Sequence, residues 1–234
     1  MKQAHHARRA ILVLECPWEL DANDSNRTSV LPFVEGIAKL VGDVEVYHAN
    51  FYDTRSLKQA LKFLCVTRYE NALIYIAGHG AGWKIAGVDL RDLMEEVGGH
   101  AQRTNISGVV LGSCFVGKHT ATLESRLQET KLRWCVGYSS ESDWLVGTMI
   151  DCSIMGRMID LEDDDLADRD VMISALASAI EPFSESFIIG NDTRDQPVAL
   201  GDSIQFVVQP RGQGQRARTV TAEVLSWKNA AALT

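Results

Sequence analysis

Continuous apolar runs recur along the chain, and between them apolar residues follow a helical spacing. Runs of β-branched and aliphatic residues are typical of strands buried on both faces of a sheet. They predict strands over residues 10–14, 44–47, 72–77, 106–111, 134–138 and 203–208. The helical spacing predicts helices over residues 30–41, 56–65, 88–97, 120–129, 145–161 and 170–180. Gly42 and the pair Gly98 and Gly99 are expected to end the helices that they follow.

The order of these elements predicts the fold class. Strands that alternate with helices form a mostly parallel sheet with helices on both faces, so we expect an α/β three-layer sandwich. No internal repeat or long low-complexity linker interrupts the pattern, which predicts one domain over residues 1–234. Ligands of such sheets bind at the carboxyl ends of the strands. Three strands are followed there by groups capable of chemistry, namely His79, Cys114 and the polar loop 139–143.

The composition excludes several kinds of partner. A hydrophobic fraction of 46% and a charged fraction of 23% are ordinary for a soluble globular protein. The formal net charge of −8 argues against nucleic acid, whose binding requires clustered Lys and Arg. The first apolar run stops at Glu15 and is too short for a signal peptide or a membrane helix. We therefore expect neither a nucleic-acid nor a membrane partner.

The five cysteines contain no C-x-x-C pair, so neither a zinc site nor a disulfide framework is indicated. This usage predicts a reducing, cytoplasmic compartment. No metal or other cofactor is expected. Four cysteines are interpreted as core or structural residues: Cys16, Cys65, Cys135 and Cys152. Three histidines without a partner pattern are interpreted as surface or loop residues: His48, His100 and His119.

Cys114 and His79 are a candidate nucleophile and proton carrier. A thiol attacks only as thiolate, and a neighbouring imidazole raises the thiolate fraction or supplies protons. His79 lies in a Gly-flanked turn, where the backbone approaches a ligand closely. The N–H groups of Gly80 and Cys114 would form an oxyanion hole for the tetrahedral intermediate of acyl transfer.

Two motifs resemble the caspase-like cysteine peptidases of clan CD, which include caspases, metacaspases, gingipains, separases and bacterial CHAT domains. An apolar strand ends in His79-Gly80, and the next ends in Gly112-Ser113-Cys114. The resemblance covers about residues 70–140 and implies a caspase-like sandwich. It also implies a dyad in which Cys114 attacks the scissile carbonyl and His79 protonates the leaving amine of a protein or peptide substrate.

In this family the strand after the Cys and the loop behind it pair with the substrate backbone and line the specificity pocket. The pairing is β-augmentation. The substrate-binding candidates that the resemblance implies are Ser113, Tyr138, Ser139, Ser140, Glu141 and Asp143.

Departures from the family pattern refine the expectation. Gly112-Ser113 replaces the Gln-Ala of caspases, so a preference for aspartate is not expected. Metacaspases carry an acidic residue where Gly112 stands. The nearest look is that of stand-alone bacterial CHAT-like or metacaspase-like peptidases. Glu141 and Asp143 favour cleavage after Arg or Lys. The family also suggests latency until an activating protease or a regulatory partner acts, and a role in bacterial defence or cell death.

Other interpretations stay open. A caspase-like protein that binds or scaffolds without catalysis shares the fold, but would be expected to lack the His or the Cys. A nucleotide-binding α/β protein is suggested by Gly78-x-Gly80-x-Gly82, which misses the G-x-G-x-x-G spacing and the P-loop Lys. No G-x-S-x-G frame surrounds Ser113, so an α/β-hydrolase is disfavoured. The acidic run 162–165 is either a calcium site without the EF-hand pattern or a solvated turn.

Overall fold

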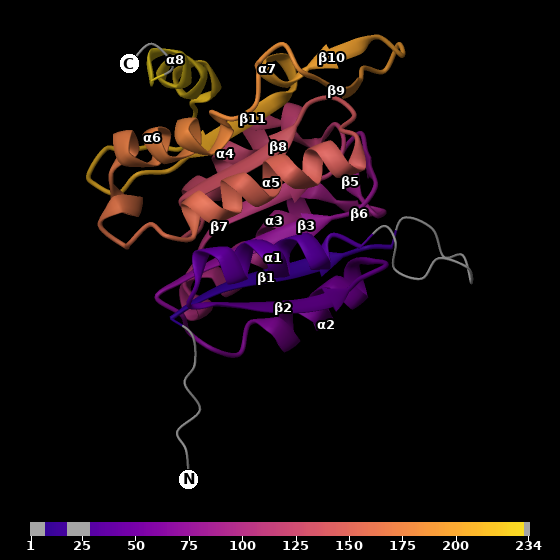
Figure 1. The fold of residues 1–234 in the computed structure, drawn as a ribbon. Coiled ribbons are helices and arrows are strands. Elements are labelled where there is room, and N and C mark those ends of the chain that lie inside the picture. The colour runs from indigo at the N-terminus through magenta and orange to yellow at the C-terminus, as the bar shows by residue number, and fades with distance from the viewer. Residues whose placement is uncertain (1–7, 18–28, 232–234) are drawn as a thin grey trace.

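A seven-stranded sheet forms the centre of the computed structural model, which describes residues 8–17 and 29–231 (Figure 1). Five neighbouring strands are parallel, and two more extend the sheet beyond β8 in antiparallel orientation. In spatial order the strands are β12 (Arg218–Thr219), β11 (Ile204–Val208), β8 (Trp134–Tyr138), β7 (Ile106–Gly112), β3 (Asn71–Ala77), β1 (Arg9–Glu15) and β2 (Val44–Asn50). The prediction of a mostly parallel sheet is confirmed.

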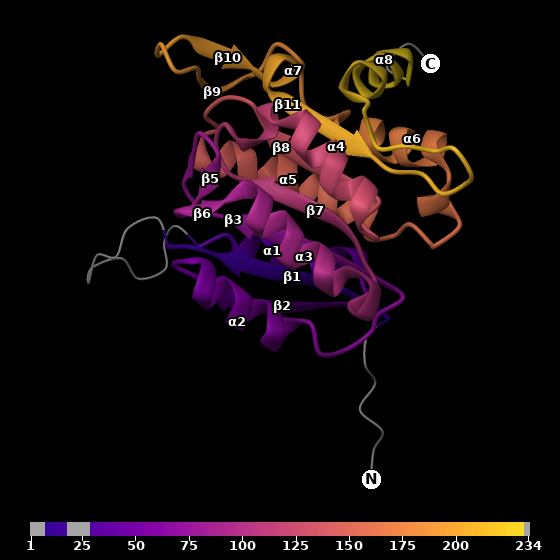
Figure 2. The same ribbon diagram turned by 180° about the vertical axis from the view of Figure 1, so that it is seen from behind.

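Helices cover both faces of this sheet, because the side chains of each buried strand alternate between two apolar cores. In β1, Ile11 and Val13 belong to one core, and Leu12 and Leu14 belong to the other. Figure 1 views the face of the first core and Figure 2 that of the second. The first core includes side chains of α1 (Leu31–Val41), α5 (Trp144–Met158), α6 (Arg169–Ile180) and α8 (Thr221–Ala231). The second includes α2 (Thr54–Leu64), α3 (Leu90–Thr104) and α4 (Thr120–Glu129). The three-layer sandwich is thus confirmed.

The end of α3 differs from the prediction. Gly98 and Gly99 lie inside the helix, which continues to Thr104 and ends where Asn105 adopts a left-handed conformation with φ of 64°. Packing explains Gly98, because a Cβ there would overlap the Thr130 side chain and lie 3.0 Å from its Cβ. Gly98 therefore allows a close approach instead of stopping the helix.

Several short elements were not predicted. Residues after β3 form a three-stranded meander of β4 (Gly80–Ala81), β5 (Lys84–Ile85) and β6 (Val88–Asp89). Val88 was expected to begin a helix, but it lies in β6, and Asp89 caps α3 by accepting a hydrogen bond from Arg91 N–H. A second hairpin joins β9 (Ile188–Asn191) and β10 (Pro197–Ala199), followed by the short α7 (Leu200–Ser203). The polar stretch from Glu19 to Ser29 predicts a loop after β1, and most of it lies outside the described residues.

The carboxyl ends of β1, β3, β7 and β8 meet at one rim of the sheet, since these strands are parallel and adjacent. Cys16, just after β1, donates its N–H to the carbonyl of Ala77 at the end of β3 (2.8 Å). This rim therefore brings together the residues that the sequence analysis singled out after these strands.

Across residues 8–17 and 29–231, no helix has the length and apolarity needed to cross a membrane.

Candidate active site

Cys114 lies on a tight bend at the carboxyl end of β7. Ser113 N–H donates to the carbonyl of Leu111 (2.8 Å), and Val116 N–H donates to that of Cys114 (2.9 Å). Between them, Phe115 has a left-handed φ of 65°, a conformation that costs a non-glycine residue about 1–2 kcal/mol. Backbone strain of this kind concentrates at functional sites. The bend leaves the Cys114 side chain half-buried at the rim.

Gly80 brings the His79 segment directly against Cys114. A Cβ on Gly80 would overlap the carbonyl oxygen of Cys114 and lie 2.7 Å from its backbone nitrogen. Only glycine permits this approach, so the sequence His79-Gly80 is fixed beside the cysteine by backbone packing. His79 itself is exposed at the rim, and its carbonyl accepts a hydrogen bond from Ala86 N–H (2.8 Å). Since Ala86 pairs with His79, the alternation of an antiparallel ladder directs the N–H of Gly80 away from β5.

A second contact joins the same two segments. His119, at the start of α4, stacks on Trp83 at the tip of the β4–β5 hairpin, with ring centroids 3.4 Å apart. Its Nε2 donates to the carbonyl of Gly82 (2.8 Å). The guanidinium of Arg91 lies 5.3 Å from the Trp83 ring. His119, interpreted from the sequence as a surface or loop residue without a partner pattern, therefore links two segments. Its contacts join the hairpin that follows His79 to the segment that follows Cys114.

The surroundings of Cys114 favour the neutral thiol. Burial raises the pKa of Cys114 above its ordinary value, and the carboxylates of Glu141 and Asp143 raise it further. The backbone N–H of Ser142 acts in the opposite direction. A neutral thiol needs a proton acceptor before it attacks a carbonyl, which is a role for an imidazole at the same rim.

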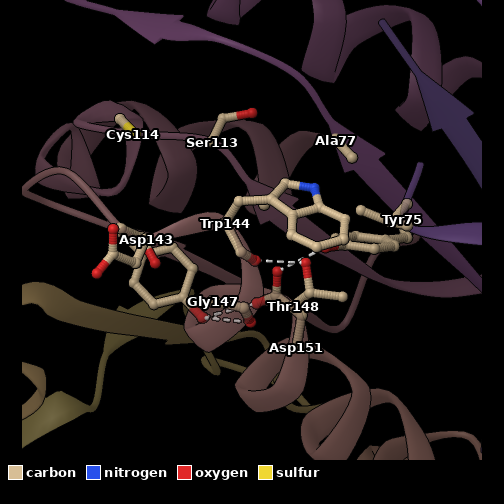
Figure 3. Close-up of a pocket in the computed structure, with 13 residues that line it drawn as sticks. Tyr75, Ala77, Ser113, Cys114, Asp143, Trp144, Gly147, Thr148 and Asp151 are labelled. Atoms are coloured by element: carbon tan, nitrogen blue, oxygen red, sulfur yellow. Dashed lines mark hydrogen bonds between the residues drawn. The ribbon is translucent and has the colours of Figure 1, made fainter. Parts of the chain in front are cut away.

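A pocket opens beneath Cys114, between the ends of β3, β7 and β8 and the start of α5 (Figure 3). Its volume is about 330 Å³ with the open mouth included, but only about 20 Å³ is open to a water molecule. The lining residues are Val30, Tyr75, Ala77, Gly112, Ser113, Cys114, Tyr138, Ser142, Asp143, Trp144, Gly147, Thr148 and Asp151. Asp143 is exposed and precedes α5, without capping it through a side-chain hydrogen bond.

Asp151 is a fully buried acid at the floor of this pocket. Its two carboxylate oxygens accept hydrogen bonds from the hydroxyls of Tyr138 (2.8 Å) and Tyr75 (2.9 Å). Burial raises the pKa of Asp151 to about 7, although both tyrosine hydroxyls act to lower it. Gly112 makes room for this group, because a Cβ there would lie 2.8 Å from an Asp151 oxygen. At neutral pH the floor thus carries a partly protonated carboxyl group.

The predicted substrate-binding residues divide into two sets. Ser113, Tyr138 and Asp143 line the pocket, whereas Ser139, Ser140 and Glu141 do not. The N–H groups of Ser139, Glu141 and Asp143 donate to the carbonyls of Ser203, Asn191 and Ile189 respectively. In this structure the loop lies along β9 and α7, which occupy these three N–H groups, and its pairing with a substrate backbone stays a prediction.

Ser142 lies in the polar loop that the sequence singled out, but sequence reasoning missed four other polar or aromatic lining residues: Tyr75, Trp144, Thr148 and Asp151. One signal was available, since Asp151 is an isolated acid within the apolar part of a helix, and a buried carboxylate needs partners. Tyr75 and Tyr138 give no such signal, because a tyrosine side chain fits a buried apolar strand as well as it fits a pocket lining.

The geometry also bears on the other interpretations. Gly80 and Gly82 lie in a hairpin, whereas a phosphate-binding glycine loop leads from a strand into a helix N-terminus. In the acidic run, Asp163 forms an ion pair with Arg211, which lowers the pKa of Asp163. No group of three or more potential metal ligands gathers within residues 8–17 and 29–231. All five cysteines are free, and Cys65, Cys135 and Cys152 are buried as expected.

The mostly parallel sheet, with helices on both faces and the site at its carboxyl rim, defines a caspase-like α/β fold. Two similar solved structures are of a secreted C11 cysteine protease from Bacteroides thetaiotaomicron. One, in complex with an irreversible peptide inhibitor, gives a TM-score of 0.53, and the other, called iotapain, gives 0.51. Each is 10% identical in sequence and covers 86% of this chain.

This chain spans 66% of the length of those structures. At 10% identity, the likeness establishes the fold. No protein-family model matches the sequence, and no curated protein matches it. The resemblance to CHAT-like or metacaspase-like proteins in particular stays a prediction.

Proposed function

We propose that this protein is a cysteine endopeptidase with a Cys114–His79 dyad. The observation that carries the proposal is the packing of Gly80 against the Cys114 backbone, at the carboxyl rim of the sheet. Two similar structures are of cysteine proteases, which agrees with this assignment.

In the proposed reaction, the Cys114 thiol gives its proton to His79 and its sulfur adds to the scissile carbonyl carbon. The N–H groups of Gly80 and Cys114 donate to the oxyanion of the tetrahedral intermediate. The C–N bond then breaks, and His79 transfers the proton to the leaving amine. Water attacks the resulting thioester with His79 as the base, which releases the carboxylic acid and regenerates the thiol.

The proposed preference is for a basic residue before the cleaved bond. Asp143, an exposed acid that lines the pocket, supplies a negative charge to a Lys or Arg side chain. Glu141 lies outside the lining residues and contributes only at longer range.

Latency is part of the proposal, since only about 20 Å³ of the pocket is open and Cys114 is held as a thiol. An activating protease or a regulatory partner remains a prediction of the family resemblance, as does a role in bacterial defence or cell death. A cytoplasmic location is proposed from the five free thiols.

A panel of fluorogenic peptides, varied at the residue before the cut, tests the proposal on wild type, Cys114→Ala and His79→Ala. We expect cleavage after Lys or Arg by wild type and none by either variant. Cleavage that persists in Cys114→Ala would exclude the dyad. No cleavage by wild type, together with an unreactive Cys114, would favour the alternative of a caspase-like binding protein.

A further inference from the structure

Three buried polar atoms around the pocket have no hydrogen-bond partner in the described part of the chain: Ser113 Oγ, Ser142 Oγ and Trp144 Nε1. All three residues line the same space below Cys114. A buried polar group without a partner is unfavourable, because it has lost its hydrogen bonds to water and gained none in return. Such a concentration at one place indicates that the closed pocket is not the state in which these groups are satisfied.

Trp144 fills the space between the nucleophile and the buried acid. Figure 3 shows its indole with Ser113 and Cys114 on one side and Tyr75 and Asp151 on the other. The remaining 20 Å³ holds about one water molecule and no side chain. Trp144 is the first residue of α5, and its indole makes an edge-to-face contact with the ring of Phe33 (centroids 5.5 Å apart). Its removal from the pocket therefore requires a side-chain rotation at a helix end, with no change to the sheet.

Asp151 has acceptor capacity left for a cation. An ionised carboxylate offers about four lone-pair sites, and the two tyrosine hydroxyls use two of them. A carboxylate buried with neutral donors only is unfavourable, whereas a cation brought next to it restores its charge. A Lys or Arg side chain that displaced Trp144 would meet Asp151, with Ser113, Ser142 and Thr148 on the walls.

We propose that Asp151 is the specificity-determining acid of this pocket and that Trp144 covers it, so that a cationic side chain enters only after the indole has turned away. The inference rests on the proposed function for the identity of the substrate. It differs in assigning the selective charge to the floor at Asp151, instead of the mouth at Asp143, and in making substrate entry depend on one side chain.

Calorimetric binding of benzamidine in a Cys114→Ala background tests this without any hydrolysis. We expect Trp144→Ala to tighten binding by at least about tenfold, because the cover is gone. Adding Asp151→Asn should weaken binding by a similar factor, about tenfold or more. Glu181→Gln, which changes an exposed acid immediately after α6, is the control and should have no effect. Neutral benzamide should bind no better to Trp144→Ala than to the parent.

Binding that is unchanged by Trp144→Ala, unchanged by Asp151→Asn, or lost only in Asp143→Asn would overturn the proposal. If Trp144→Ala does not melt cooperatively, fluorine NMR of 5-fluorotryptophan-labelled protein decides the question. The Trp144 signal, assigned with Trp144→Phe among the five tryptophans, should shift when benzamidine saturates. A signal that does not move would overturn the proposal.

The two proposals fail separately. Asp151-dependent binding of benzamidine without any peptide hydrolysis by wild type would leave the pocket assignment intact and overturn the peptidase. Cys114-dependent hydrolysis after basic residues that survives in Asp151→Asn would do the reverse.

Discussion

At the residue scale, two ionisable groups within one pocket have pKa values raised by burial. Cys114 stands at the rim and Asp151 at the floor. The same desolvation that keeps the thiol protonated keeps the acid partly neutral. Without a ligand, these two groups thus carry less negative charge than an exposed thiol and carboxylate would. A bound cation would lower the pKa of both.

The environment of Cys114 predicts slow alkylation at neutral pH. Glu141 and Asp143 raise the pKa of the thiol through their charges. Glu141→Gln with Asp143→Asn should therefore lower the pKa of Cys114 and increase its labelling by iodoacetamide at pH 8, because the thiolate is the form that reacts. Peptide mass spectrometry measures labelling at this cysteine alone. Glu181→Gln is the matched control, and equal rates in all three proteins would disprove the electrostatic argument.

The buried carboxyl of Asp151 predicts a pH-dependent stability. Its pKa of about 7 exceeds the ordinary value near 3.8, so between these values the folded chain holds a proton that the unfolded chain has lost. Stability attributable to Asp151 therefore falls as the pH rises through this interval. Urea unfolding at pH 5 and pH 8 should show a decline in wild type that is about 2 to 3 kcal/mol larger than in Asp151→Asn. Parallel declines in the two proteins would contradict this.

At the element scale, two contacts position the hairpin that carries His79 on the bend that carries Cys114. One is the backbone contact of Gly80, and the other is the stack of Trp83 on His119. Both are packing contacts between segments that are distant in sequence. Packing between two loops at the rim of the sheet would therefore position the proposed dyad, and small displacements of catalytic groups affect catalysis strongly.

Gly80→Ala should damage the site more than the fold. The added methyl group overlaps the Cys114 carbonyl oxygen, which forces the hairpin and its N–H donor away. We expect peptidase activity to fall about tenfold or more, since one lost oxyanion donor costs about 10²–10³ in kcat. The melting temperature should also fall, because overpacking costs about 1–3 kcal/mol. Gly99→Ala, where no atom lies within 4 Å of the added Cβ, should retain activity. Equal activity in both variants would refute the argument.

The long elements were predictable from the sequence, and the short ones were not. Strands β3 and β7 are buried on both faces and are therefore mostly apolar in sequence, which determines their type and approximate ends. The two-residue strands β4 to β6 are too short to show any periodicity. Gly98 was misread because the residue that makes it necessary, Thr130, is distant in sequence.

At the scale of the whole molecule, the candidate site could be predicted only in part. His79, Gly80 and Cys114 follow consecutive strands of a parallel sheet, so topology alone places them at one rim. The pocket floor could not be predicted in this way, because Asp151 reaches it from α5 and its partners come from β3 and β8. Likewise, the sequence of loop 139–143 does not show that β9 lies alongside it and accepts hydrogen bonds from the N–H groups of Glu141 and Asp143.

The proposed peptidase requires Cys114 to act as a nucleophile and His79 to accept its proton. Covalent labelling with a lysyl acyloxymethyl ketone peptide tests it most directly, since the thiolate displaces the acyloxy group as a carboxylate and forms a thioether. Intact mass and peptide mapping should locate one adduct at Cys114 in wild type, markedly slower labelling in His79→Ala and none in Cys114→Ala. An adduct on another cysteine, or no adduct while iodoacetamide still labels Cys114, would contradict the claim.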